Sequence, residues 1–463
     1  MVAIGSISGS WNPGRGILTE WTASPSSREL AARAPHDPLP PTFQQEKHLR
    51  SADSARKIQR RTPRLIMTSW DVAGWCDVAA MTGAINAHLR RHDTYHSAFD
   101  IIADGTITRR TIDTPELIEF SPVVIGFMEQ DQIREHVLSA TPDTLDWDCF
   151  TFGVIQKEGN FTVYANIDHL HTDGTSSLVI YQDISQDYRD LNCDSDGTDT
   201  EPEPELEPDP TIYRDFTARQ HVEVGTLTRD SRPVKDWVNF ALDAEDEWPS
   251  FPLELGSADD GAGQSFTVEV LNAEQTEAFD TACRRAGARF SGGVLACAAI
   301  TDHNFTHSDT VHMFSPLDTR TEAQANSAGW YASLFPISIE VTANDFGSTA
   351  RSAQKSFDAN KHLSSVPFDR VRDLVDSDEL DDAVSSRPMM VSIFDFRKLS
   401  AANTDKLGMF IDDLNQGGIN IWVTRNADAT IVTLSFPDTF DSRRSIHHYV
   451  AALRDEFLSA ANS

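Results

Sequence analysis

The chain has 463 residues, of which 40% are hydrophobic and 24% charged, as expected for a soluble globular protein of two or three domains. Its net charge of −32 disfavours nucleic acid and anionic membrane surfaces as partners, because phosphate binding needs clustered Lys and Arg. No apolar run approaches the roughly 18 residues that span a bilayer, and the first ten residues do not resemble a signal peptide. Five scattered Cys without a C-x-x-C pair indicate a reducing, cytoplasmic setting, with peripheral attachment to the inner membrane face as an alternative.

In the first half, residues 1–60 are predicted to be irregular and rich in Pro, with a basic cluster at Arg56-Lys57 and Arg60-Arg61. The spacing of apolar residues then predicts a strand over 64–70 and a helix over 77–90 with Asp77 as its N-cap. Further strands are expected at 106–111, 150–156 and 161–167, followed by a helix at 176–184.

Residues 194–210 form an acidic, Pro-rich tract of low complexity. Like charges and proline keep such a segment extended, so it is predicted to be an exposed linker. It divides the chain into an N-terminal domain, 1–205, and a C-terminal domain, 211–463.

The second half is predicted to begin with a helix at residue 212. Strands are expected at 266–271, 311–315, 335–341, 389–394, 419–425 and 430–436, and helices at 273–286, 292–301 and 443–459. Strands and helices mix without strict alternation in both halves, which predicts two α/β (α+β) domains of similar size.

Residues 168–174 read Asp-His-Leu-His-Thr-Asp-Gly and directly follow the strand predicted at 161–167. A strand fixes the backbone of His169, and a polar turn ending in Gly174 exposes its imidazole. Because the unperturbed pKa of imidazole is about 6.5, His169 suits a general base, and Asp173 can brace the turn.

The sequence of residues 169–174 matches the H-x-x-x-D-G signature of the superfamily of condensation domains and chloramphenicol acetyltransferase, which the chain resembles over nearly its whole length. Other landmarks of that family follow in the same order at 41–49, 89–99, 213–216, 329–336, 366–371 and 387–394. No adenylation or carrier segment flanks them, so a stand-alone acyltransferase is expected. Residues 85–96 and 288–294 are most similar to the trehalose-lipid branch of the polyketide-associated (Pap) acyltransferases.

This resemblance implies two chloramphenicol acetyltransferase-like subdomains in a V shape, with a tunnel between them and His169 at their junction. It implies transfer of a long-chain acyl group from a thioester, on coenzyme A or a polyketide synthase carrier domain, to a hydroxyl of trehalose or a related glycolipid. No acyl-enzyme and no bound cofactor are expected. An amide-forming condensation enzyme and a non-catalytic recruitment module are the alternatives, and the second would normally lack the catalytic His.

The resemblance also assigns roles to other residues. Asp173 is expected to be structural and to pair with a distant Arg, for which Arg320 is the candidate; Gly174 is expected to allow a tight turn. Asp168 stands where many family members have a His, a change that could alter the tautomer or tilt of His169. Candidates for stabilising the oxyanion lie in the second half: Ser392, Asn420 and Trp422.

Two groups of histidines have a spacing that could bind a metal ion. His171 lies two residues after His169, and residues two apart on a strand share a face, but no third ligand is near in sequence. His88, His92 and His96 are spaced by four, as on one face of a helix, and are interpreted as structural. No metal is therefore expected. Cys283 and Cys297 lie in helix-like apolar stretches with no evident base beside them, which favours packing over a nucleophilic role.

Overall fold

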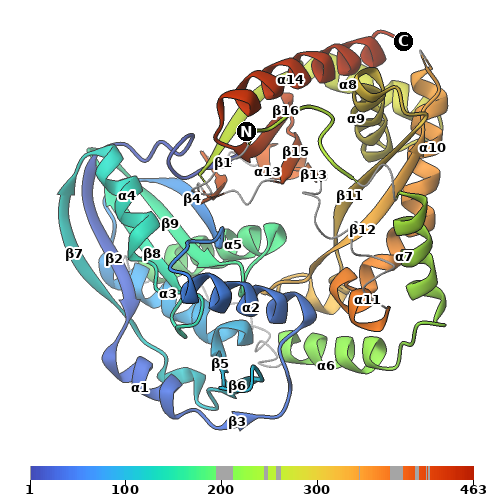
Figure 1. Ribbon diagram of the computed structural model, residues 1–463. Helices are drawn as coiled ribbons and strands as arrows, with labels where there is room; N and C mark the ends of the chain where they lie inside the picture. The colour runs from blue at the N-terminus through green and yellow to red at the C-terminus, as the bar shows by residue number, and fades with distance from the viewer. Residues whose placement is uncertain are drawn as a thin grey trace.

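The computed structural model of the chain describes residues 2–193, 212–244, 249–256, 262–343, 345–375, 389–401, 406–412, 414 and 418–463. Figure 1 shows two lobes, each built on its own sheet and covered by helices, which confirms the predicted α/β class. No helix within these ranges is both long and apolar enough to cross a membrane. The linker predicted at 194–210 lies outside the described residues, so the boundary between 205 and 211 stays a prediction.

The first lobe is built on a seven-stranded sheet in the order β1-β14-β4-β9-β8-β2-β7. All neighbours are antiparallel except β1 and β14. The strands are β1 (Ala3–Ser6), β14 (Gly408–Ile411), β4 (Leu65–Ala73), β9 (Asn160–Asp168), β8 (Phe150–Gln156), β2 (Gly16–Ala23) and β7 (Phe120–Met128). Strand β14 comes from the second half of the sequence, so the second half contributes to the sheet of the first lobe.

Helices and a small sheet complete the first lobe. The helices are α1 (Pro25–Arg33), α2 (Phe43–Lys57), α3 (Val78–Arg91), α4 (Gln130–Ala140) and α5 (Gly174–Cys193). The small sheet has the order β3 (His36–Asp37), β6 (Ile107–Thr111) and β5 (Ser97–Ile101). Asp77 accepts hydrogen bonds from the N–H groups of Ala79 and Ala80 at the start of α3, which confirms it as the N-cap.

The prediction that residues 1–60 are irregular is wrong. Strand β2 pairs with β7 on one side and β8 on the other, and most of its residues are buried. Pro25 occupies the first turn of α1, where a missing N–H costs nothing. Helix α2 starts with a capping box between Thr42 and Gln45. The prolines thus mark helix starts and connections instead of an unstructured segment.

The second lobe is built on a six-stranded mixed sheet. Its order is β10 (Gly263–Asn272), β16 (Ala429–Pro437), β15 (Ile419–Arg425), β13 (Met389–Asp395), β11 (Thr310–Asp318) and β12 (Ala332–Glu340). Its helices are α7 (Arg232–Asp243), α8 (Ala273–Arg285), α9 (Phe290–Thr306), α10 (Phe346–Asn360), α11 (Phe368–Leu374), α13 (Arg397–Ala401) and α14 (Phe440–Ala461). Helix α6 (Ile212–Gly225) instead contacts the first lobe, where the N–H groups of Tyr213 and Arg214 donate to Asp93.

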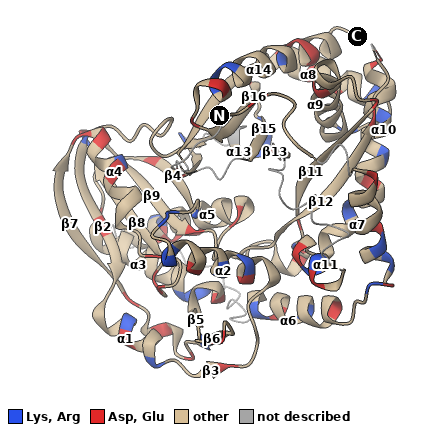
Figure 2. Cartoon of the chain, in the orientation of Figure 1, with Lys and Arg blue, Asp and Glu red and all other residues tan. Residues whose placement is uncertain are grey.

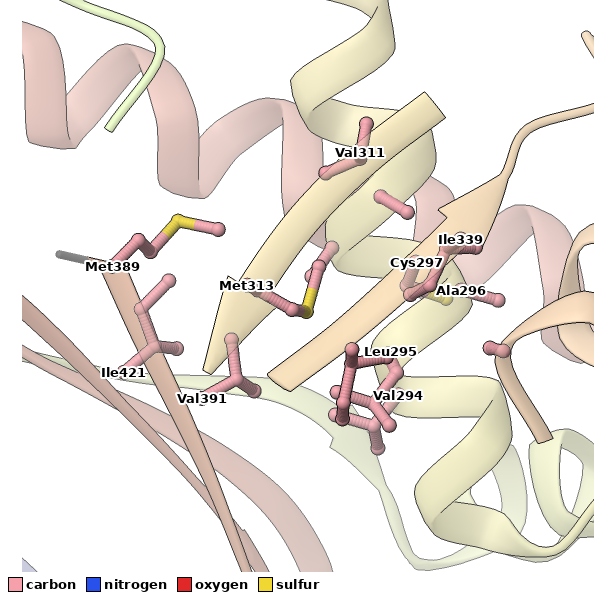
Figure 3. Close-up of a cluster of buried hydrophobic side chains, with 14 of the residues drawn as sticks. Val294, Leu295, Ala296, Cys297, Val311, Met313, Ile339, Met389, Val391 and Ile421 are labelled. Carbon is pink, nitrogen blue, oxygen red and sulfur yellow. The ribbon is translucent and has the colours of Figure 1, made fainter. Parts of the chain in front are cut away.

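The core of the second lobe forms around α9, which is buried on nearly all sides. Small residues in this helix let it lie close against the sheet, where it packs on side chains of four strands (Figure 3). Those labelled there are Val311, Met313, Ile339, Met389, Val391 and Ile421. Burial of this kind is worth about 25 cal/mol per Å² of apolar surface and fixes the positions of β11, β12, β13 and β15.

The N-terminal strand β1 joins the two lobes. The carbonyl of Ile4 accepts a hydrogen bond from the Thr433 hydroxyl of β16 (3.1 Å), and the hydroxyl of Ser265 in β10 donates to that of Ser6 (2.9 Å). Asn426 accepts the N–H of Val2 at 2.8 Å. The lobes are therefore held to each other through β1 as well as through β14.

Candidate functional site

His169 lies at the end of β9, where the strand leaves the sheet and the chain turns toward α5. Its N–H donates to the carbonyl of Arg64 (2.6 Å), so the backbone is anchored to the residue that precedes β4. The side chain is half-buried. The residue is thus firmly placed, with part of its surface accessible.

The imidazole of His169 lies against the indole of Trp330, with ring centroids 4.0 Å apart and an angle of 32° between the planes. His48 of α2 contacts the same indole edge-on, and its ring centroid is 6.5 Å from that of His169. Burial, and after it the charge of His48, hold the pKa of His169 below its usual value. A neutral imidazole at neutral pH follows, which is the form that can accept a proton.

The two ring nitrogens of His169 differ in their surroundings. Nδ1 is shielded from solvent and has no hydrogen-bond partner within the part of the chain that the structure describes. Buried polar atoms without partners are rare in folded proteins, and catalytic groups are among those that have none. The shielding of Nδ1 leaves Nε2 as the nitrogen through which the ring can reach a substrate.

The position of Trp330 depends on Gly329 and Tyr213. Gly329 has φ +150°, and a Cβ at this position would come within 2.4 Å of the Tyr213 ring. The hydroxyl of Tyr213 donates to the carbonyl of Trp330 (3.2 Å). Only glycine fits this approach, so the second lobe delivers the indole to His169 through a fixed backbone conformation.

Asp173 and Arg320 form a buried ion pair between the two lobes, as predicted from the sequence. Arg320 Nη1 and Nη2 each donate to one carboxylate oxygen at 3.0 Å, and the arginine and aspartate side chains are 3% and 1% exposed. The N–H groups of Tyr331 and Ala332 donate to the same carboxylate at 2.9 and 3.0 Å. Burial alone would raise the pKa of Asp173, but Arg320 and these donors keep it low.

Ser176 extends this contact. Its hydroxyl accepts from Arg320 (2.7 Å) and donates to the carbonyl of Gly329 (2.7 Å), next to Trp330. The ion pair and the indole are therefore parts of one network. This network ties the first turn of α5 to the segment that precedes β12.

Gly174 begins α5 without a positive φ, so the expected turn conformation does not explain it. A Cβ on Gly174 would lie 3.0 Å from the ring of Phe394, on β13 of the second lobe. The glycine thus permits close packing between the lobes beside His169.

The carboxylate of Asp168 is buried and binds groups of the first lobe. His48 Nε2 (2.7 Å), Arg64 Nη1 (3.1 Å) and the Thr144 hydroxyl (2.6 Å) all donate to its carboxylate. Burial alone would raise its pKa, but His48, Arg64 and Thr144 hold it well below the usual range. The residue that departs from the family pattern is thus an ionised anchor for His48.

The oxyanion candidates lie on two neighbouring strands of the second lobe. Ser392 of β13 is paired in register with Trp422 of β15, and Asn420 lies two residues before Trp422 on the same strand. Ser392 is 2% exposed, whereas Asn420 and Trp422 are half-buried. Trp422 packs against the core of the first lobe. No hydrogen bond joins these three to His169 among the described residues, and their role stays a prediction.

His88, His92 and Asp183 bring their ligand atoms within 4.8 Å of one another. His88 Nδ1 and His92 Nε2 donate to one oxygen of Asp183 at 2.9 and 2.6 Å. His88 Nε2 bonds with the Tyr95 hydroxyl (3.2 Å), and His92 Nδ1 accepts the N–H of Ala328 (3.3 Å). Hydrogen bonds within the protein therefore account for all four ring nitrogens, and they tie α3 to α5 and to the second lobe.

The remaining residues singled out from the sequence, which are His96, His171, Cys283 and Cys297, are buried and have hydrogen-bond or packing partners other than His169. His96 bonds with the carbonyl of Leu89 (3.0 Å), and burial lowers its pKa to about 4. His171 contacts the Thr94 hydroxyl (3.2 Å) and has a similarly low pKa for the same reason. Burial raises the pKa of the Cys283 thiol to about 12 and also raises that of the Cys297 thiol well above its usual value, as expected of packing residues.

Comparison with known proteins places these features in a family. A model described as "Condensation domain" matches residues 67–409. The 2'-acyl-2-O-sulfo-trehalose (hydroxy)phthioceranyltransferase PapA1 of Mycobacterium tuberculosis is 37% identical over 458 residues, which cover 98% of this chain and 88% of PapA1. The trehalose-2-sulfate acyltransferase PapA2 of Mycobacterium bovis is 37% identical over 463 residues, covering 98% of this chain and 96% of PapA2.

Solved structures agree with this placement. A structure titled "PapA2 acyl transferase" superposes with a TM-score of 0.90 at 36% identity, covering 100% of both chains. The first condensation domain of the calcium-dependent antibiotic synthetase superposes with a TM-score of 0.65 at 15% identity, covering 91% of this chain and 97% of its own. The second likeness concerns the fold alone.

Proposed function

Because this chain belongs to the condensation-domain family and is one of its Pap acyltransferases, we propose that it moves a long-chain acyl group from a thioester to a hydroxyl of trehalose or a related glycolipid. The acceptor is inferred from relatives whose names specify sulfated trehalose. The observation that carries the proposal is the half-buried imidazole of His169, held between the lobes against Trp330 with its pKa lowered.

In the proposed reaction His169 is the general base. Its Nε2 accepts the proton of the sugar hydroxyl as the oxygen attacks the thioester carbonyl carbon. The tetrahedral intermediate then breaks the carbon–sulfur bond, and the imidazolium returns the proton to the leaving thiolate. Atoms and charges balance without an acyl-enzyme, and base catalysis of this kind contributes roughly 10²–10⁴-fold.

The negative charge that develops on the carbonyl oxygen requires donors aimed at it. Ser392, Asn420 and Trp422 remain the proposed donors, since β13 and β15 belong to the lobe opposite His169 and Phe394 of β13 contacts Gly174. The thioester is proposed to be acyl-coenzyme A or an acyl group on a polyketide synthase carrier domain, and no bound cofactor takes part.

The test is thiol release from a panel of acyl-coenzyme A donors, with and without trehalose or sulfated trehalose, for wild type beside His169→Ala. Release that depends on the sugar in wild type and is lost in the variant, with an unchanged fold by circular dichroism, is the expected result. Equal turnover in His169→Ala would overturn the assignment of the base. Release that depends on an amine instead of a sugar would identify an amide-forming enzyme.

A further inference from the structure

A pocket of about 390 Å³ lies where α2 ends and the chain leads into β4. Four arginines line it: Arg56, Arg60, Arg61 and Arg64. In Figure 2, blue marks Lys and Arg at the end of α2 and along the segment that leads to β4. The basic cluster noted in the sequence is therefore part of a concave surface.

Three of the four arginines have no ion-pair partner in the described part of the chain. Arg56, Arg60 and Arg61 are exposed, and Arg61 makes only a long hydrogen bond to the Leu138 carbonyl (3.4 Å). Such a gathering is unusual in a chain with a net charge of −32, because neighbouring like charges repel. An anion bound among them would relieve that repulsion.

The two carboxylates in the pocket lining are already engaged. Asp412 is buried and accepts the N–H groups of Arg64 and Leu65 at 2.7 and 3.0 Å. Asp143 accepts the N–H of Leu145 (3.1 Å) and lies next to Thr144 at the pocket edge. Hydrogen bonds from N–H groups do not neutralise these two carboxylates, but the four arginines of the lining outnumber them, so the pocket suits an anion.

The pocket adjoins the candidate active site. Arg64 and Thr144 line it and also donate to Asp168, at 3.1 and 2.6 Å. The carbonyl of Arg64 accepts the N–H of His169. The pocket thus shares Arg64 and Thr144 with the hydrogen-bond network of Asp168, the residue next to His169 in the chain.

We propose that this pocket binds a phosphate or sulfate ester carried by one of the two substrates of the acyl transfer. Planar guanidinium groups bind such tetrahedral oxyanions in bidentate fashion, and the hydroxyl of Thr62, also in the lining, can donate to them. The inference rests on the proposed function. Two sources share this chemistry: the phosphates of coenzyme A or of a carrier's pantetheine arm, and a sulfate on the sugar.

Binding is tested first, without turnover. Inorganic phosphate and sulfate are titrated into the full chain by calorimetry at constant ionic strength, with sodium chloride as the reference salt. We expect saturable binding that weakens about tenfold or more in Arg60→Gln/Arg61→Gln, which loses two bidentate donors. The matched control is Arg443→Gln/Arg444→Gln on α14, with the same change of charge and no expected effect.

Kinetics then distinguish the two sources. A rise of about tenfold in KM for acyl-coenzyme A, with no rise for an acyl-N-acetylcysteamine thioester that lacks phosphate, assigns the pocket to the donor. The same rise for sulfated trehalose but not for trehalose assigns it to the acceptor. The Arg60→Gln/Arg61→Gln variant leaves His169, Asp168 and Arg64 in place. Its kcat with the donor that lacks phosphate and with unsulfated trehalose should therefore equal that of the wild type.

Absence of saturable anion binding in wild type, or equal binding in wild type and Arg60→Gln/Arg61→Gln, would overturn the proposal. Because the titration needs no acyl transfer, it shows whether the pocket binds an anion even if no pair of donor and acceptor is turned over. Failure of the proposed function would appear separately, as missing turnover beside intact anion binding.

Discussion

Trp330 of the second lobe and His169 of the first place their rings 4.0 Å apart, so the proposed base is positioned by both lobes. Neither lobe alone holds the imidazole in this orientation, since Gly329 and Tyr213 set the indole while Arg64 sets the His169 backbone. Any change in the relative position of the lobes would alter the contact between these two rings.

Replacement of Trp330 tests this dependence. Trp330→Ala should lower kcat by up to about tenfold, because aromatic contacts are worth roughly 0.5–1.5 kcal/mol beyond their buried area, whereas Trp330→Phe should keep most activity. The matched control is Trp75→Ala, since Trp75 is 72% exposed. Loss of activity in the control variant as well would point to a general effect of removing tryptophan.

The rate should depend on pH through His169. Transfer needs the neutral imidazole, and burial together with the charge of His48 lowers its pKa. The rate should therefore be level at neutral pH and decline only below pH 6.5, as the imidazole becomes protonated. The measurement is kcat/KM from pH 5 to 8; a decline centred above pH 6.5 would contradict it.

His48 should act on the rate through His169. In His48→Gln the nearby positive charge is removed, so the pKa of His169 should rise and the acidic decline of kcat/KM should move to higher pH. Glutamine can still donate to Asp168, which limits structural loss. A lower rate with an unmoved pH profile would assign His48 a purely structural role.

The Asp173–Arg320 pair should contribute to the stability of the folded chain. Removing one partner leaves a buried, uncompensated charge, so Asp173→Ala and Arg320→Ala should each lower the free energy of unfolding by about 3–5 kcal/mol. Urea denaturation measures this. The double variant Asp173→Asn/Arg320→Met should lose less than the sum of the single losses, because no charge is left unpaired.

Replacement of Asp302 by Asn should stabilise the folded chain, and the gain should depend on pH. Burial raises its pKa to about 8, and its hydrogen-bond partner is the Tyr449 hydroxyl (2.9 Å). Between about pH 4 and 8 the folded chain keeps a proton that the unfolded chain releases, so this group costs stability increasingly as pH rises.

Asp302→Asn removes that cost and should raise the free energy of unfolding by about 1–3 kcal/mol at pH 8, and by less at pH 5. Urea denaturation at both pH values measures the difference, with exposed Asp309→Asn as the control. A gain that is the same at both pH values would show that Asp302 is ionised in the folded chain.

The motif with its flanking strand and helix could be recognised from sequence because the signal is local. The period of apolar residues changes from two to 3.6 across residues 161–184, and β9 and α5 follow it. The pairing of Asp173 with Arg320, 147 residues apart, came instead from a family resemblance that fixes the order of distant segments.

His48 and Trp330 were not singled out, although both lie in segments that resemble the family. Nothing in α2 distinguishes the face that meets His169, and the position of Trp330 depends on the close approach of Gly329 to Tyr213. Strand β7 was missed because it lies at a sheet edge and exposes Val124 and Phe127, which obscures the alternation. Such features depend on partners that are remote in sequence.

The placement of β14 between β1 and β4 has a consequence for synthesis of the chain. A ribosome must have translated residue 411 before β1 and β14 can complete one side of the first sheet, although its other strands end at residue 168. Until then β4 presents an unpaired edge, which is a site for wrong pairing between nascent chains. Such long-range closure slows folding, so expression at low temperature or with chaperones should favour the native form.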